Sequence, residues 1–262
     1  MRRLSLISLL LCLCLLPGCS SGQVRQCRIN VLEEFPHDRT SYTQGLFFHD
    51  GALYESTGQW GSSTFRKVDI ATGKALERKD FDQKYFVEGS VVLDGTLYVL
   101  TWTEKVAFLY DAGSLEYKAT LHYPREGWGL TTDGKQLIAS DGSAYLYFLD
   151  GNMKMKKRVK VTMDGRPVRY LNELEWIGGR VWANIYTTDM IVVINPSNGK
   201  VEAVLDCSGL LPENLRDQDT DVFNGIAYDG ESLFVTGKCW PRMYKVEPVD
   251  KKTGKVLKIN KL

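Results

Sequence analysis

Residues 45–54 have the sequence GLFFHDGALY, in which two apolar segments flank the dipeptide Asp50-Gly51. Glycine readily adopts the positive φ that a tight primed turn requires, so Asp-Gly between apolar segments predicts a β-hairpin. The chain repeats this arrangement, with Asp-Gly or Gly-Gly at the turn, at residues 89–98, 129–138, 174–182 and 225–234. One hairpin motif therefore occurs five times.

A second turn follows each of the first four hairpins. Neighbouring turns lie 39 to 45 residues apart, beginning at Asp69, Asp111, Asp150 and Asn195. Two hairpins in each unit of about 40 residues make a four-stranded blade, and a radial array of blades is a β-propeller. Only residues 210–221 look helical, and this stretch is short and contains Pro212. We expect an all-β, five-bladed β-propeller with four antiparallel strands per blade.

The composition limits the classes of function. The 262 residues include 33 Lys and Arg against 32 Asp and Glu, and this near-neutral balance gives no general attraction for nucleic acid. The three histidines, His37, His49 and His122, form no pair with metal-binding spacing, which argues against a histidine-based zinc site. We expect no cofactor. A structural calcium ion in a propeller channel is compatible with the fold, but the sequence displays no ligand set for it.

The first segment resembles a secretory signal. Two arginines precede an apolar run at residues 4–16, which is too short to span a bilayer as a permanent helix. Cys19 directly follows Leu-Pro-Gly, as in a bacterial lipobox, where the cysteine is lipidated and becomes the first residue after cleavage. The alternative is an ordinary signal peptide with an incidental cysteine.

This interpretation divides the chain into a lipoprotein-type signal peptide at residues 1–18, a tether at 19–30 and a propeller domain at 31–262. We expect a monomer that is exported and held at the bacterial cell envelope, on its periplasmic or outer side, by the lipid on Cys19. Beyond that residue the chain contains Cys27, Cys207 and Cys239. A disulfide between Cys207 and Cys239 is one hypothesis, and three unpaired, mostly buried thiols are an equally good one.

The candidate functional residues occupy equivalent positions in the repeat. The first strand of each blade lines the channel of a propeller, so residues that precede the repeated motifs converge at one mouth. These residues are Gln44, Glu88, Trp128, Asn172 with Glu173, and Asn224. Loops between strands add Trp102, Tyr186, and Lys238 with Trp240. Any one of them has an alternative role in packing or capping, but together they suit a small ligand that carries an amine or amide.

Nine ordered motifs resemble the plant and bacterial type of glutaminyl cyclase. They are residues 35–46 (FPHDRTSYTQGL), 53–58 (LYESTG), 86–89 (FVEG), 100–102 (LTW), 126–130 (EGWGL), 171–175 (LNELE), 181–185 (VWANI), 224–227 (NGIA) and 236–238 (TGK). The resemblance covers essentially the whole chain after the signal segment. It implies a five-bladed propeller and a glutaminyl-peptide cyclotransferase, an acyltransferase that converts the N-terminal glutamine of peptides and proteins to pyroglutamate and ammonia without a metal.

The resemblance also implies residue roles. Glu88 matches the acidic catalyst of the family, and we assign Lys238 and Asn172 to catalysis beside it. The expected substrate-binding residues are Gln44, Tyr42, Phe86, Trp102, Trp128 and Tyr186. Two of these depart from the family pattern, because Tyr42 stands where Phe is usual and Tyr186 where Trp is expected. Both keep a ring, so we expect altered affinity rather than lost activity, although a buried hydroxyl needs a partner.

These residue types suit the cyclisation. One carboxylate, Glu88, can accept a proton from the attacking α-amine and deliver it to the departing amide nitrogen. Lys238, Asn172 or Gln44 can donate to the developing oxyanion, and the sequence does not choose among them. A non-catalytic propeller that binds proteins is one alternative. A metal-dependent hydrolase is another, although the Trp and Lys residues around Glu88 suit a metal poorly.

Overall fold

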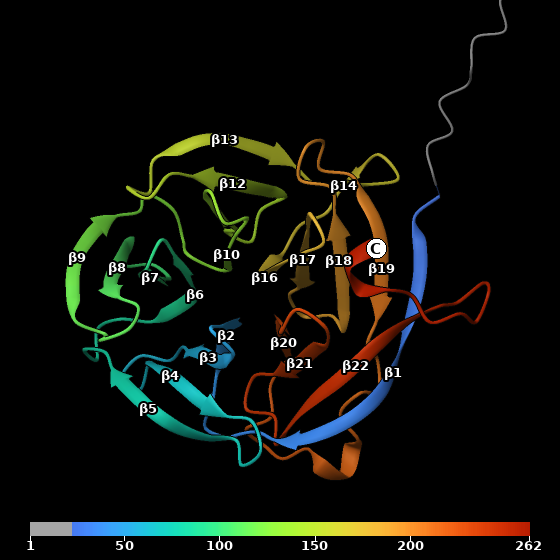
Figure 1. The fold of residues 1–262 in the computed structure, drawn as a ribbon, viewed down its shortest axis with the longest axis horizontal. Helices are drawn as coiled ribbons and strands as arrows, with labels where there is room; N and C mark the ends of the chain where they lie inside the picture. The colour runs from blue at the N-terminus through green and yellow to red at the C-terminus, as the bar shows by residue number, and fades with distance from the viewer. Residues whose placement is uncertain (1–22) are drawn as a thin grey trace, which may run out of the picture.

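The structure, a computed structural model, describes residues 23–262. Its regular elements are 22 β-strands and two short 3₁₀-helices. The strands form sheets set around a central axis, and each sheet runs from the axis to the periphery (Figure 1). The fold is therefore all-β and propeller-like, as predicted. The predicted signal peptide, the lipidation site Cys19 and the first part of the tether lie outside the described residues.

Three sheets each contain four antiparallel strands that follow one another in sequence. The first sheet contains β2 (Thr43–His49), β3 (Ala52–Thr57), β4 (Thr64–Asp69) and β5 (Lys74–Asp80). The second contains β6 (Val87–Leu93), β7 (Thr96–Thr101), β8 (Val106–Asp111) and β9 (Tyr117–His122). The third contains β10 (Leu130–Thr132), β11 (Leu137–Ala139), β12 (Tyr145–Leu149) and β13 (Met155–Lys160). A small hairpin of β14 (Thr162–Met163) and β15 (Arg166–Pro167) follows the third sheet.

The remaining strands form one eight-stranded sheet, in which the N-terminal strand β1 (Arg25–Pro36) lies between the last two groups of strands. One group is β16 (Leu171–Ile177), β17 (Arg180–Ile185), β18 (Met190–Ile194) and β19 (Val201–Asp206), and the other is β20 (Phe223–Tyr228), β21 (Leu233–Gly237) and β22 (Arg242–Asp250). Strand β1 is antiparallel to β22 and, at its start, parallel to β19. The beginning of the described chain therefore pairs with its end and closes the ring.

The position of β1 corrects the predicted tether. Residues 25–30 belong to the sheet rather than to a linker, because their backbone pairs with β19 on one side and β22 on the other. The helix-like stretch at 210–221 contains only the 3₁₀-helix Glu213–Leu215, and a second 3₁₀-helix covers Ile259–Lys261. Neither helix in the described part of the chain is long and apolar enough to cross a membrane.

The five predicted hairpins are all present, as β2–β3, β6–β7, β10–β11, β16–β17 and β20–β21. In the first turn Asp50 has φ 47° and Gly51 has φ 74°, and in the second Asp94 and Gly95 have φ 49° and 67°. Two successive positive φ angles are the mark of the type I′ turn expected from Asp-Gly. The Asp-Gly dipeptides therefore predicted these turns correctly, because both turn residues adopt the positive φ that a type I′ turn requires.

The repeated glycines lie where the inner strands crowd together. Strands β2, β6, β10, β16 and β20 contact one another in turn around the axis. A Cβ atom on Gly45 would overlap the backbone nitrogen of Ser90, and one on Gly89 would overlap that of Leu130. Glycine is therefore required at these positions by the close approach of neighbouring backbones.

Two buried glutamates of β16 connect three of the inner strands. The carboxylate of Glu173 accepts the backbone N–H of Leu46 in β2 at 3.2 Å and that of Ile226 in β20 at 2.9 Å. Glu175 accepts the backbone N–H of Tyr228 at 3.1 Å. Burial raises the pKa of both carboxyl groups, that of Glu175 to about 8. These side chains hold the axis together rather than forming part of an open site.

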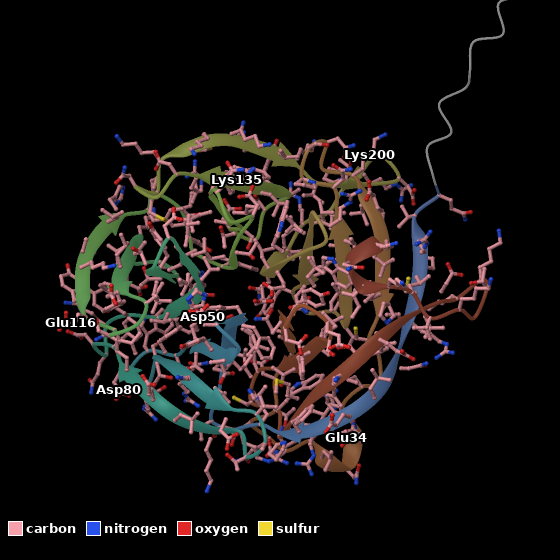
Figure 2. All side chains as sticks on the ribbon, in the orientation of Figure 1. Glu34, Asp50, Asp80, Glu116, Lys135 and Lys200 are labelled. Atoms are coloured by element: carbon pink, nitrogen blue, oxygen red, sulfur yellow. The ribbon has the colours of Figure 1, made fainter. Side chains whose placement is uncertain are left out.

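The hydrophobic core lies between neighbouring sheets. One cluster packs Tyr98 and Leu100 of β7 against Leu137 of β11 and Tyr147 of β12. Charged side chains such as those of Glu34, Asp80, Glu116 and Lys200 lie around the outer edge (Figure 2). Each sheet thus buries its faces on its neighbours, as expected for radially arranged sheets.

The cysteines of the described region do not form the hypothesised disulfide. Cys27, Cys207 and Cys239 are all free. Cys207 is buried in a core cluster with Trp182 and Tyr244, whereas Cys239 lies in the turn between β21 and β22, where its backbone N–H donates to Ser41. The two thiols belong to different environments, and the interpretation as unpaired thiols is confirmed.

Candidate active site

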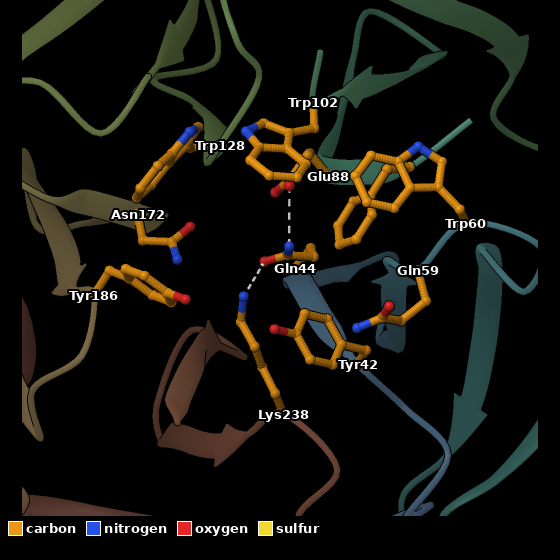
Figure 3. A pocket seen from close by; sticks show the side chains of 11 residues that line it. Tyr42, Gln44, Gln59, Trp60, Glu88, Trp102, Trp128, Asn172, Tyr186 and Lys238 are labelled. Atoms are coloured by element: carbon orange, nitrogen blue, oxygen red, sulfur yellow. Dashed lines mark hydrogen bonds between the residues drawn. The ribbon is translucent and has the colours of Figure 1, made fainter. Parts of the chain in front are cut away.

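A pocket of about 270 Å³ lies where the inner strands β2, β6 and β16 begin. Figure 3 shows side chains from several sheets converging on it. All nine catalytic and substrate-binding candidates line it, namely Tyr42, Gln44, Phe86, Glu88, Trp102, Trp128, Asn172, Tyr186 and Lys238. The expectation that residues far apart in sequence meet at one mouth is confirmed.

Three polar side chains form a hydrogen-bonded chain at the base of the pocket. Lys238 Nζ donates to Gln44 Oε1 at 2.7 Å, and Gln44 Nε2 donates to Glu88 Oε1 at 3.0 Å (Figure 3). All three are nearly inaccessible, with Glu88 4% and Lys238 2% exposed. Gln44 therefore connects the carboxyl group to the ammonium group without a direct ion pair.

Burial dominates the electrostatics of this chain. Desolvation raises the pKa of Glu88 well above its ordinary value, and the negative charges of Glu104 and Glu126 add to this effect, while Lys238 opposes it. Desolvation also lowers the pKa of Lys238, with Glu88 and Asp221 opposing. A carboxyl group that binds a proton more tightly than usual is suited to moving protons near neutral pH.

The rings of Tyr42 and Tyr186 flank the lysine. The ring centre of Tyr42 lies 4.5 Å from Lys238 Nζ, and that of Tyr186 lies 5.3 Å from it. Both tyrosines are half-buried. Their ring faces stabilise the buried ammonium by cation–π attraction.

Aromatic rings form one wall of the pocket. Phe86 lies 5.5 Å from Trp102 and 6.1 Å from Tyr42, measured between ring centres. Phe86 also rests against Gly58, where any Cβ atom would overlap its ring. This wall desolvates Glu88, which lies two residues beyond Phe86 at the start of β6.

The carboxylate of Glu126 holds two indole rings in place. Its Oε2 accepts the indole N–H of Trp102 at 2.9 Å and that of Trp128 at 3.1 Å. Trp128 also packs against Gly142 and meets Tyr186 edge-on at 5.5 Å between ring centres. One exposed side chain therefore fixes the relative positions of both tryptophans.

Asn172 directs its side-chain amide into the pocket (Figure 3). Its Oδ1 atom is buried and has no hydrogen-bond partner within the described residues, while its backbone carbonyl accepts the hydroxyl of Ser140 at 2.7 Å. A buried polar atom without a partner in a pocket is a candidate contact for a polar ligand.

Three residues expected near the mouth have structural roles instead. Asn224 donates to the backbone carbonyl of Thr43 at 2.9 Å, and Glu173 bridges the inner strands. Trp240 is buried and donates its indole N–H to the carbonyl of Asp221 at 2.9 Å. None of them lines the pocket.

Two lining residues were not predicted, Gln59 and Trp60. Both lie in the loop between β3 and β4, which is equivalent to the loops that hold Trp102, Tyr186 and Lys238, but they lie two and three residues beyond the end of β3 rather than directly after it. Within residues 23–262, no group of three or more His, Cys, Asp or Glu side chains is arranged to hold a metal ion. The pocket instead combines one carboxyl group, one amine, three amides and several rings.

Comparison with known proteins identifies the family. The family model described as glutamine cyclotransferase matches residues 5–248. The chain belongs to the glutamine cyclotransferase family. One relative is the glutaminyl-peptide cyclotransferase of Arabidopsis thaliana, which is 43% identical to this chain over 228 residues. The match covers 84% of this chain and 71% of the relative.

A solved structure agrees with this membership of the glutamine cyclotransferase family. The crystal structure of Myxococcus xanthus glutaminyl cyclase matches with a TM-score of 0.80 at 30% sequence identity. The match covers 90% of this chain and all of the other. The resemblance inferred from the ordered motifs is therefore confirmed.

Proposed function

We propose that the chain is a glutaminyl-peptide cyclotransferase that converts the N-terminal glutamine of peptides and proteins to pyroglutamate and ammonia. The observation that carries this proposal is the buried Glu88 carboxyl group, enclosed by aromatic rings and connected through Gln44 to Lys238. The family membership and the 43% identical relative support the same reaction.

The raised pKa of Glu88 suits the first step. A free α-amine is largely protonated at neutral pH, so the substrate arrives mainly as an ammonium. A carboxylate with a raised proton affinity takes that proton, which leaves a neutral amine as the nucleophile and a carboxylic acid beside it. The same proton is then available for the leaving nitrogen.

The following steps balance without another reactant. The amine nitrogen bonds to the γ-carbonyl carbon and closes the five-membered ring, and the carbonyl oxygen becomes negative. Glu88 gives its proton to the amide nitrogen, the bond between that nitrogen and carbon breaks, and ammonia leaves. The ring nitrogen then gives its extra proton to Glu88, and the released ammonia takes this proton and leaves as ammonium, which restores the Glu88 carboxylate.

Lys238 and Asn172 are the donors that we propose for the oxyanion. In the unliganded pocket the amide of Gln44 is already engaged, because it donates to Glu88 and accepts from Lys238. Gln44 therefore positions the two ionisable groups. Preorganised donors at a developing oxyanion are worth about 2.7–4 kcal/mol each in well-studied enzymes.

The aromatic side chains complete the proposed site. Phe86, Trp102 and Trp128 surround the glutaminyl chain together with Tyr42 and Tyr186, and they exclude water, whose attack would yield glutamate. No metal is needed in this mechanism, and an amine beside a single carboxyl group is a poor donor set for a divalent cation. A metal chelator should leave ammonia release unchanged.

The finer description of the fold and the location of the protein are also proposals. We count five blades, with β1 as the outer strand of the last blade, on the basis of the five inner strands that meet at the axis. The signal-like segment supports export and lipid anchoring at Cys19 of a monomeric protein. Partition of the wild type, but not of Cys19→Ala, into a detergent phase tests the anchor.

Replacement of Glu88 by Gln tests the function. This change keeps the shape of the side chain but removes the titratable proton, so we expect kcat for a Gln-initiated peptide to fall about 10²- to 10⁴-fold. The measurement is a coupled ammonia assay on folded protein. Glu116→Gln, which alters an exposed glutamate at the outer edge (Figure 2), is the matched control. Equal ammonia release by wild type and Glu88→Gln would remove Glu88 from the mechanism.

A further inference from the structure

The pocket opens at the loop between β3 and β4. Of its eleven lining residues, only Gln59 and Trp60 are exposed, whereas the others are buried or half-buried. Trp60 has 52% of its surface accessible. The other lining residues with accessible surface, Tyr42, Trp102, Trp128 and Tyr186, are half-buried. A peptide whose first residue reaches Glu88 therefore finds the most exposed lining residues at this loop.

Trp60 presents a fixed ring face at this opening. Its indole N–H donates to Glu104 Oε1 at 3.0 Å. Its ring centre lies 5.0 Å from that of Phe86 and 5.4 Å from that of Trp102. The ring is thus held at its polar edge and along one side while about half of its surface stays accessible, which is the arrangement of a binding platform for an apolar group.

Gln59 is held in an unusual backbone conformation beside this platform. Its φ of 101° lies in the region that favours glycine. Its carbonyl accepts the N–H of Ser62 at 3.1 Å and the hydroxyl of Ser63 at 2.8 Å. Ser63 in turn accepts the N–H of Val87, next to Glu88. Backbone strain of this kind persists where surrounding contacts impose it, and it concentrates at functional sites.

The side-chain amide of Gln59 is free to bind a ligand. Among the described residues it makes no hydrogen bond, and it faces the pocket between Trp60 and Tyr42 (Figure 3). An amide offers both a donor and an acceptor, which matches the donor and acceptor of a peptide group.

We propose that Gln59 and Trp60 form a subsite for the second residue of the substrate, in which the indole face binds a large apolar, preferably aromatic, side chain and the Gln59 amide binds the peptide group that joins the first two residues. The proposal rests on the proposed function, because it assumes that the first residue is the glutamine held at Glu88. Such a subsite makes the enzyme selective for the residue after the glutamine.

The test compares three dipeptide amides, Gln-Phe, Gln-Gly and Gln-Arg, by kcat/KM in the ammonia assay. We expect the wild type to prefer Gln-Phe over Gln-Gly by about tenfold, in line with the energy of an aromatic pair and its buried area. Trp60→Ala should bring the two values within about twofold of each other. Trp60→Phe, which keeps a ring, should retain most of the preference.

Gln59→Gly tests the second half of the subsite. Glycine adopts the same backbone conformation without strain, so the loop should keep its shape while the amide is lost. We expect KM for Gln-Gly amide to rise about two- to tenfold, as for the loss of one hydrogen bond, with kcat less affected. An unchanged KM would remove Gln59 from the subsite.

The outcomes separate this proposal from the function on which it rests. If the wild type releases no ammonia from any of the three substrates, the proposed function fails. If it releases ammonia but Trp60→Ala lowers kcat/KM for Gln-Phe and Gln-Gly equally, Trp60 only supports the packing of Phe86 and Trp102, and the subsite is overturned. A preference for Gln-Arg that depends on Trp60 would also overturn it, because the face would then select a cation.

Discussion

The raised pKa of Glu88 comes mainly from burial and from charged residues that do not hydrogen-bond to it. Burial makes the largest contribution to its raised pKa, and Glu126 adds to it through its negative charge. Glu126 is exposed and joins two indoles by hydrogen bonds. It therefore influences both the shape of the pocket and the proton affinity of the carboxyl group within it.

Replacement of Glu126 by Gln separates these two effects. Glutamine keeps an acceptor oxygen for the indole N–H groups but removes the charge that raises the pKa of Glu88. The pKa of Glu88 should fall, so the activity profile that depends on its protonation should shift to lower pH. The measurement is kcat/KM against pH at low ionic strength, where an exposed charge acts most strongly. Glu116→Gln should show no shift, and a shift of Glu126→Gln to higher pH would contradict the argument.

At the scale of single elements, the loop between β3 and β4 positions the aromatic wall through one contact. Gly58 has a backbone conformation that alanine can adopt, but a Cβ atom there would overlap the Phe86 ring. Gly58→Ala should therefore push Phe86 out of place. We expect a loss of about 1–3 kcal/mol in the free energy of unfolding and a higher KM, measured by denaturant titration and by the ammonia assay.

A matched glycine provides the control for this element. An added Cβ on Gly113 would approach only Asp111 Oδ1, at 3.6 Å, and Gly113 lies in the outer turn between β8 and β9. Gly113→Ala should leave both stability and KM close to the wild-type values. If Gly58→Ala behaves in the same way, the contact with Phe86 does not determine the position of the wall.

The elements also show which parts of the molecule the sequence could predict. The inner hairpins and the positions of Gln44 and Glu88 were predictable because crowding at the axis requires Gly45 and Gly89, and these site residues stand just before the glycines. Asn172 has the equivalent position in β16, where Glu173 replaces the glycine. Gln59 and Trp60 were harder to predict, because Trp102, Tyr186 and Lys238 directly follow the second strand of a sheet, whereas these two residues lie two and three positions beyond the end of the equivalent strand β3.

The sequence also does not predict which strands pair when they lie far apart along the chain. Strand β1 lacks the hairpin signal because its partners, β19 and β22, lie about 180 or more residues away along the chain. The sequence alone therefore predicts a tether where residues 25–30 form a strand. The proposed pairing of Cys207 with Cys239 failed for a related reason. Thiol count indicates that a disulfide is feasible, but burial and backbone position decide which thiols meet.

At the scale of the whole molecule, the ring closes at two levels. On the outside, β1 joins strands from the two ends of the described chain. On the inside, Glu173 and Glu175 accept backbone N–H groups from strands that belong to different sheets. The site depends on both closures, because its residues come from β2, β6, β16 and the loop after β21.

The inner closure makes stability depend on pH. Burial raises the pKa of Glu175 from 4.5 to about 8. Between these values the folded protein holds a proton that the unfolded chain has released, so the free energy of unfolding falls as pH rises through this range. The shift in pKa corresponds to roughly 5 kcal/mol from this carboxyl group when 1.36 kcal/mol is assigned to each pKa unit. Its contribution is fully present below about pH 4.5 and is lost by about pH 8.

Glu175→Gln should remove this part of the dependence, because glutamine stays neutral while its carbonyl still accepts the Tyr228 N–H. Chemical denaturation of both proteins from pH 5 to pH 9 gives the comparison. We expect the variant to gain stability relative to the wild type as pH rises. The difference between the two free energies of unfolding at each pH removes the contributions of Glu88 and Glu173, which are the same in both proteins. A constant difference across this range would mean that Glu175 is already ionised in the folded protein at pH 5, and that the axis is held by a buried carboxylate rather than a neutral acid.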